Sequence, residues 1–173
     1  DMLAMAERIA NEEKRRKPLR ERIKEWEKSG IKVNVIERIE DVPNRAARAE
    51  IRNGSTVPGW YEQGNGEVYI FLPHIKDVKD LDVTILHEAI SHKGLRELLG
   101  EERFNELCDK VWDMMPKSEK DYFENHYAGV KNIKDPIERR RAAADEYMAH
   151  LAEKANLTPE EKTIWDNIVK MLR

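Results

Sequence analysis

Two histidines and a glutamate fall within one short segment, at His87, Glu88 and His92. Zinc binds neutral imidazole nitrogens and carboxylate oxygens, and a catalytic site leaves one of its positions to water. In the common zinc helix, H-E-x-x-H, both histidines bind the metal and the glutamate is the general base. The segment H-E-A-I-S-H therefore predicts His87 and His92 as zinc ligands and Glu88 as the catalytic residue.

The spacing of the two histidines departs from that pattern by one residue. On a regular α-helix, a spacing of five places two side chains roughly 140° apart, against about 40° for a spacing of four. The imidazoles can share a metal only if the helix absorbs one extra residue, as a single-turn π-bulge does. The apolar residues between 85 and 90 and those between 95 and 99 lie on nearly opposite sides of an ideal helical wheel. An inserted residue narrows that mismatch, but a helix buried on two sides, or broken at Gly94, explains it equally well.

A third ligand is needed, and the segment 144–150 (A-D-E-Y-M-A-H) offers Glu146. A carboxylate from a second helix completes a site made of two histidines and one glutamate. Alanines flank Glu146 on its own helix, so another helix can approach that face closely. Asp145, His126 and His150 remain alternatives as ligands. For the whole set, the alternative is an ordinary polar helix face without metal.

The segment 84–96 (T-I-L-H-E-A-I-S-H-K-G-L-R), taken with Asp145-Glu146-Tyr147, resembles the zincin-like metallopeptidase domains. More narrowly, residues 55–155 are similar to such domains in large multi-domain proteins of phages and conjugative elements. The H-E-x-x-x-H spacing with a downstream acidic pair is also similar to the dipeptidyl peptidase III family of gluzincins, in the motifs alone. The resemblance implies a zincin-like fold, a peptide or protein substrate, and zinc held by His87, His92 and Glu146 with Glu88 as general base.

Two positions differ from the pattern of these relatives. Ser91 precedes the second histidine where glycine is commoner, and His150 ends the second motif where an acidic residue is expected. Ser91 concerns the distortion that the zinc helix needs in order to bring the two histidines together. His150 concerns the groups that would hydrogen-bond to the metal ligands.

Overall charge gives the chain no general attraction to nucleic acid or anionic membranes. Among 173 residues, 31 Lys and Arg nearly balance 34 Asp and Glu, leaving a formal net charge of -3. No apolar run approaches the length of a membrane span. We therefore expect neither a nucleic-acid nor a membrane partner. The single cysteine, Cys108, cannot form an internal disulfide or a multi-cysteine zinc site, so a cytoplasmic location is expected.

The elements expected around these residues form a small sheet followed by a helical half. Alternation over 31–35 predicts a strand after a charged helix that ends at Gly30. Asn65-Gly66 predicts a hairpin between 60–62 and 67–72. Helices are expected over 2–29, 44–52, 80–99, 101–115, 118–127, 136–154 and 158–172, with Asp135 and Thr158 as caps. The fold class is α+β, zincin-like, with a small, mostly antiparallel sheet; residues 1–30 form a charged N-terminal helix and residues 31–173 the metallopeptidase domain.

Three functions are compatible with these features. The first is a zinc-dependent peptide-bond hydrolase, in which the strand over 67–72 pairs with an extended substrate. The second is a non-catalytic, zinc-stabilised interaction or assembly module of a mobile-element multi-domain protein. The third is a metal-free helical domain that docks a partner through its charged first helix. The first is preferred because a purely structural site does not need a glutamate beside its first ligand.

Overall fold

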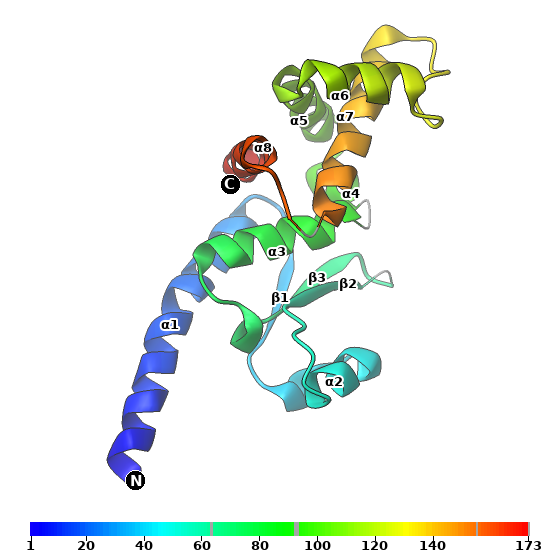
Figure 1. The fold of residues 1–173 in the computed structure, drawn as a ribbon. Coiled ribbons are helices and arrows are strands. Elements are labelled where there is room, and N and C mark those ends of the chain that lie inside the picture. The colour runs from blue at the N-terminus through cyan, green and yellow to red at the C-terminus, as the bar shows by residue number, and fades with distance from the viewer. Residues whose placement is uncertain (63, 92–93, 155, 173) are drawn as a thin grey trace. The chain divides into compact units, whose positions relative to one another are not determined.

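A computed structural model describes residues 1–62, 64–91, 94–154 and 156–172 (Figure 1). The chain divides into two compact units, Asp1–Glu88 and Ala89–Arg173. The first contains α1 (Met2–Lys28), β1 (Val33–Ile36), η1 (Ile39–Asp41), α2 (Arg45–Arg52), β2 (Gly59–Glu62), β3 (Glu67–Phe71), η2 (Leu72–His74) and most of α3 (Val78–Ser91). The second contains α4 (Gly94–Leu99), α5 (Glu101–Met114), α6 (Lys117–Asp121), η3 (Tyr122–His126), α7 (Pro136–Glu153) and α8 (Pro159–Leu172). The expected α+β class is confirmed.

The sheet of the first unit has three strands in the order β1-β3-β2. The predicted hairpin is confirmed, because β2 and β3 pair antiparallel with Tyr61 opposite Val68. The pair β1 and β3 is parallel, with Val33 opposite Val68. The sheet is therefore mixed, and the prediction of a mostly antiparallel sheet is wrong. The reason is that β3, the most apolar strand, takes the central position, where both of its edges are paired.

Helices α2 and α3 lie on opposite faces of this sheet (Figure 1). Phe71 of β3 and Ala47 of α2 form a buried cluster with Val42, against which Trp60 of β2 packs. Successive side chains of a strand point to opposite faces, so Gly59, next to Trp60, faces α3. A Cβ added to Gly59 would lie 3.0 Å from Thr84 Cγ2. The absence of a side chain at Gly59 thus allows α3 to lie close to the sheet.

Helix α1 belongs to the first unit, and only its second half is buried. Leu19, Ile23 and Trp26 are buried, whereas Met2 and Ile9 near the start of the helix are exposed. Gly30 follows the helix with φ 94°, the positive value expected for its stop signal. The division into a charged helix over 1–30 and a domain over 31–173 stays a prediction.

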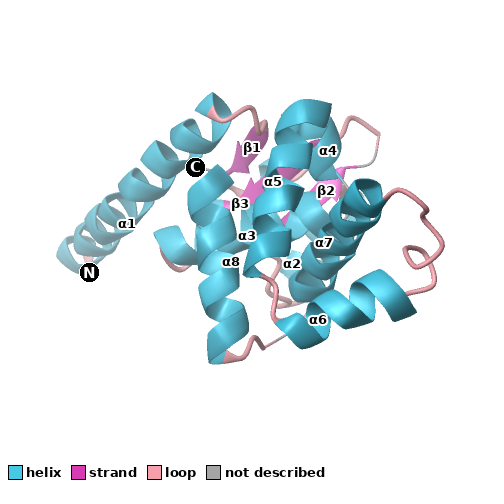
Figure 2. Ribbon diagram, turned by 90° about the horizontal axis from the view of Figure 1, so that it is seen from above, coloured by secondary structure: helices cyan, strands magenta, loops and turns pink. Residues whose placement is uncertain are grey.

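In the second unit, α5 packs against both α7 and α8 (Figure 2). The predicted caps are confirmed. Asp135 accepts the Ile137 amide at 3.2 Å, and Thr158 and Glu161 accept each other's amides at 3.2 and 2.9 Å. Where a single helix was expected over 118–127, α6 is followed by the π-helical η3, in which the Tyr127 amide donates to the Tyr122 carbonyl at 3.0 Å. None of the helices in the described ranges is both long and apolar enough to cross a membrane.

Candidate metal centre

Helix α3 carries the first two residues of the predicted site. Its start is capped by Asp77, whose carboxylate accepts the Asp80 amide at 2.8 Å, while Asp80 accepts the Lys76 amide at 2.9 Å. The first bond satisfies an amide of the first helical turn, which has no intrahelical partner, and the second bond joins the segment before the helix to that turn. His87 and Glu88 follow on the same helix, and both are half-buried.

Two helical segments are described within the predicted helix over 80–99. Helix α3 is α-helical throughout Val78–Ser91, and α4 begins at Gly94. The two residues between these segments lie outside the described residues, so a helix broken near Gly94 and a helix buried on two sides both stay open as explanations for the apolar residues that change side. His92 lies outside the described residues, so its part in a metal site and the expected π-bulge between the two histidines stay predictions.

The Glu88 carboxylate lies against strand β2. The Tyr61 backbone amide donates a hydrogen bond to it, whereas burial raises the pKa of this carboxyl to about 7, the larger of the two effects. The Phe71 amide donates to the Pro58 carbonyl at 2.9 Å. In an antiparallel pair, only every second residue of a strand hydrogen-bonds to the neighbouring strand, and Pro58 is one of those residues. Gly59 and Tyr61 therefore direct their backbone groups away from β3, toward the free edge of β2. No other strand of the described residues pairs with that edge, so Glu88 lies at an open sheet edge.

This arrangement corrects the prediction for the substrate strand. Strand β3, which includes most of the predicted segment 67–72, is hydrogen-bonded to β1 on one side and to β2 on the other. No edge of it is left for an extended peptide. The strand with an open edge beside Glu88 is β2.

Glu146, the predicted third ligand, is half-buried on α7 in the second unit. The Tyr127 hydroxyl donates a hydrogen bond to its carboxylate, and this bond raises the pKa of the Tyr127 phenol. Tyr127 comes directly after η3, so the π-helical turn determines where this hydroxyl lies. A carboxylate oriented in this way matches metal ligands, which are usually held by hydrogen bonds from surrounding groups.

The alternative ligands in the second unit have other surroundings. Asp145 lines a cavity on another side of α7 and already has an interaction partner. His126 is exposed, with Nε2 3.5 Å from an Asp121 carboxylate oxygen. His150 is exposed and lies edge-on to the Phe123 ring at 5.8 Å.

The three predicted site residues that the structure describes belong to different units. His87 and Glu88 are neighbours in the first unit, and Glu146 belongs to the second. Among the described residues, no three His, Cys, Asp or Glu side chains come together as a metal site would require, and His92 stands outside that set. The donor types still suit zinc, since two imidazoles and an oriented carboxylate leave a fourth position for water.

For two of the predicted site residues, the hydrogen-bond partner was missed in the sequence. The Tyr61 amide at the β2 edge is the partner of Glu88, and the Tyr127 hydroxyl is the partner of Glu146. The Tyr61 amide could be identified only from the order of the strands in the sheet, and the residue pattern does not predict that order. The π-helical turn before Tyr127 has no sequence signature comparable to a capping box.

Comparisons with protein-family models, curated proteins and solved structures found no match to this chain.

Proposed function

We propose that this chain is a zinc-dependent peptidase domain, with His87, His92 and Glu146 as metal ligands and Glu88 as general base. The observation that carries the proposal is the hydrogen bond from the Tyr61 amide to the Glu88 carboxylate. It puts the glutamate of the H-E pair at the open edge of β2, where an extended peptide can add as a further strand.

In the proposed reaction, a peptide lies along β2 and exposes one carbonyl to a water molecule beside Glu88. Glu88 accepts a proton from that water as its oxygen attacks the carbonyl carbon. Glu88 then delivers the proton to the departing amine nitrogen as the C–N bond breaks. Zinc would supply the Lewis acid that lowers the pKa of water toward neutrality and polarises the carbonyl.

A second candidate is a non-catalytic, zinc-stabilised interaction or assembly module of a mobile-element multi-domain protein. It needs the same metal ligands but no reaction at Glu88. Metal binding would then contribute directly to the free energy of folding, as in structural zinc sites.

The test begins with metal analysis of protein purified without added zinc. We expect one zinc per chain in the wild type, and loss of zinc in His87→Ala, His92→Ala and Glu146→Ala. His126→Ala is the control and should retain the metal. Protein that binds no zinc in any preparation would overturn both candidates.

Glu88→Gln then separates the two candidates. In a peptidase it should retain zinc and lose cleavage of a mixed peptide library. Wild-type protein that is fully loaded with zinc but cleaves no peptide would instead support the structural module.

A further inference from the structure

The second unit contains a cavity of about 290 Å³. It lies among the last turn of α3, α4, α5 and α7, and its walls are formed by Ile90, Leu95, Arg96, Phe104, Asp145 and Met148. Sites for drug-sized ligands generally range from about 300 to 1,000 Å³. A ligand of this cavity must therefore be small.

The floor of the cavity is apolar. Ile90, Leu95, Phe104 and Met148 each expose 4% of their surface or less. Buried side chains of this kind are held by their neighbours and do not need to rearrange to receive an apolar group. The floor therefore suits a single branched or unbranched aliphatic side chain.

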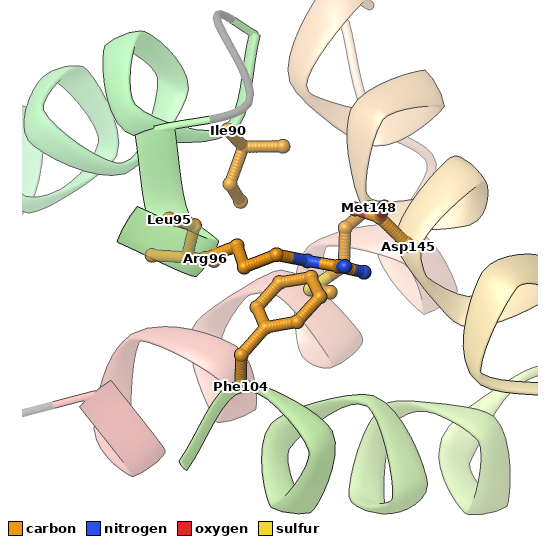
Figure 3. A pocket seen from close by; sticks show the side chains of 6 residues that line it. All are labelled: Ile90, Leu95, Arg96, Phe104, Asp145 and Met148. Atoms are coloured by element: carbon orange, nitrogen blue, oxygen red, sulfur yellow. The ribbon is translucent and has the colours of Figure 1, made fainter. Parts of the chain in front are cut away.

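A guanidinium group lies at the mouth. The Arg96 side chain is 55% exposed, and its guanidinium carbon lies 4.9 Å from the centre of the Phe104 ring. Figure 3 shows this side chain running across the cavity, over the Phe104 ring and toward Met148. A Glu101 carboxylate oxygen is 3.9 Å from the guanidinium, which is too far for a hydrogen bond. A guanidinium held against an aromatic ring keeps its N–H groups available for bidentate contact with a carboxylate.

A carboxylate lies on the α7 side of the same cavity. Asp145 already has an interaction partner, but an ionised carboxylate accepts several hydrogen bonds at once. The cavity thus presents one positive and one negative group above an apolar floor. A ligand with only a carboxylate would face Asp145 as a like charge, and a ligand with only an amine would face Arg96.

We propose that this cavity binds a free α-amino acid with an aliphatic side chain, such as leucine or methionine. The ligand carboxylate contacts Arg96, its ammonium group contacts Asp145, and its side chain packs against Ile90, Leu95 and Met148. The proposal does not depend on zinc or on peptidase activity, because none of the proposed metal ligands lines the cavity.

The test is a methyl NMR titration of the whole chain in the presence of EDTA. Leucine should shift the methyl signals of Ile90, Leu95 and Met148 with a saturable dependence on concentration. N-acetyl-leucine, which lacks the ammonium charge, and leucine methyl ester, which lacks the carboxylate, should each bind about tenfold more weakly, since a charged hydrogen bond is lost. Glycine, without a side chain, should cause no saturable shift. If N-acetyl-leucine or the ester binds as well as leucine, the assignment of a zwitterionic ligand is overturned.

Arg96→Gln should weaken leucine binding by about tenfold. Arg140→Gln is the matched control, because the Arg140 guanidinium also lies over an aromatic ring, Trp112 at 5.8 Å, and its side chain is 52% exposed. It should bind leucine as the wild type does. Absence of any saturable shift with leucine, or equal weakening by both substitutions, would overturn the proposal.

Discussion

Arg22 on α1 and Asp82 on α3 form a buried bidentate ion pair in the first unit. The Nε and Nη2 atoms of Arg22 lie 2.8 and 2.7 Å from the two carboxylate oxygens. The Trp26 indole donates to the same carboxylate at 2.7 Å. Since α3 also carries His87 and Glu88, this pair fixes the first part of the site-bearing helix to α1.

Asp82→Ala should destabilise the protein by about 3 to 5 kcal/mol, because it leaves a buried guanidinium without its main partner. The Trp26 indole would also lose its acceptor. Chemical denaturation gives the free energy of unfolding. Glu13→Ala is the control: it breaks an ion pair between Arg20 and a carboxylate that is 64% exposed, and should cost far less stability. Equal effects would show that the buried pair contributes no more than a surface pair.

Gly59→Ala should destabilise the first unit by about 1 to 3 kcal/mol through overpacking. The new Cβ would lie 2.8 Å from the Tyr69 carbonyl oxygen and 3.0 Å from Thr84 Cγ2, so either β3 or α3 must move. Gly64→Ala is the control, since nothing lies within 4 Å of a Cβ there. Thermal unfolding compares the two variants. A Gly59→Ala protein as stable as the control would mean that α3 does not approach the sheet this closely.

The stability of the metal-free chain should depend on pH through Glu88. Burial raises the pKa of this carboxyl from 4.5 to about 7. As pH rises from 4.5 to 7, the unfolded chain therefore releases its proton first, and the free energy of unfolding falls. Glu88→Gln removes that loss, so the variant should be more stable than the wild type at pH 8, by on the order of 3 kcal/mol. At pH 4, where Glu88 is protonated in both states, this gain should be absent.

Glu67→Gln provides a control of opposite sign for the same measurement. The Lys32 ammonium, followed by the Asn34 amide, lowers the pKa of the Glu67 carboxyl. The ionised form is thus stabilised by folding, and this contribution is present above pH 4.5 and is lost as pH falls through the lowered pKa. Glu67→Gln should therefore be less stable than the wild type at pH 8. A gain at pH 8 in both variants would contradict the assignment for Glu88.

Cys108 should be unreactive in the folded protein. Its side chain is fully buried, and burial raises the pKa of the thiol to about 12, with a further contribution from Asp145. Because the thiolate is the reactive form, alkylation at pH 8 should proceed only through unfolding. Labelling with iodoacetamide across a denaturant series, read by mass spectrometry, should follow the unfolding curve. Rapid labelling of the native protein would contradict this burial.

Tyr127→Phe should weaken zinc binding by about 10- to 100-fold if Glu146 is a ligand, because removing a hydrogen bond to a ligand typically has this effect. The readout is zinc affinity in competition with a chelator, which is independent of catalysis. Tyr122→Phe is the control, since Tyr122 packs on the same aromatic cluster through its ring, 5.1 Å from the Phe123 ring. Unchanged affinity in Tyr127→Phe would leave Tyr127 as a packing residue.

Local features of the fold were readable in the residues themselves. The stop of α1 at Gly30, the hairpin at Asn65-Gly66 and the caps at Asp135 and Thr158 all follow from interactions within a few residues of chain. The segment 80–99 was harder, because two helices in succession produce the same apolar pattern as one helix that is buried on two sides. The structure describes α3 up to Ser91 and α4 from Gly94, so this choice stays a prediction.

The sequence by itself therefore determined the α+β class, the main helices and the chemical types of the candidate ligands. Tertiary structure alone decided that β3 is central and β2 is the open edge, that the Tyr61 amide meets Glu88, and that the Tyr127 hydroxyl meets Glu146. The physical reason is the separation along the chain between the groups that interact. Caps and turns depend on backbone groups a few residues apart, whereas strand order and these hydrogen bonds join residues whose proximity results only from packing.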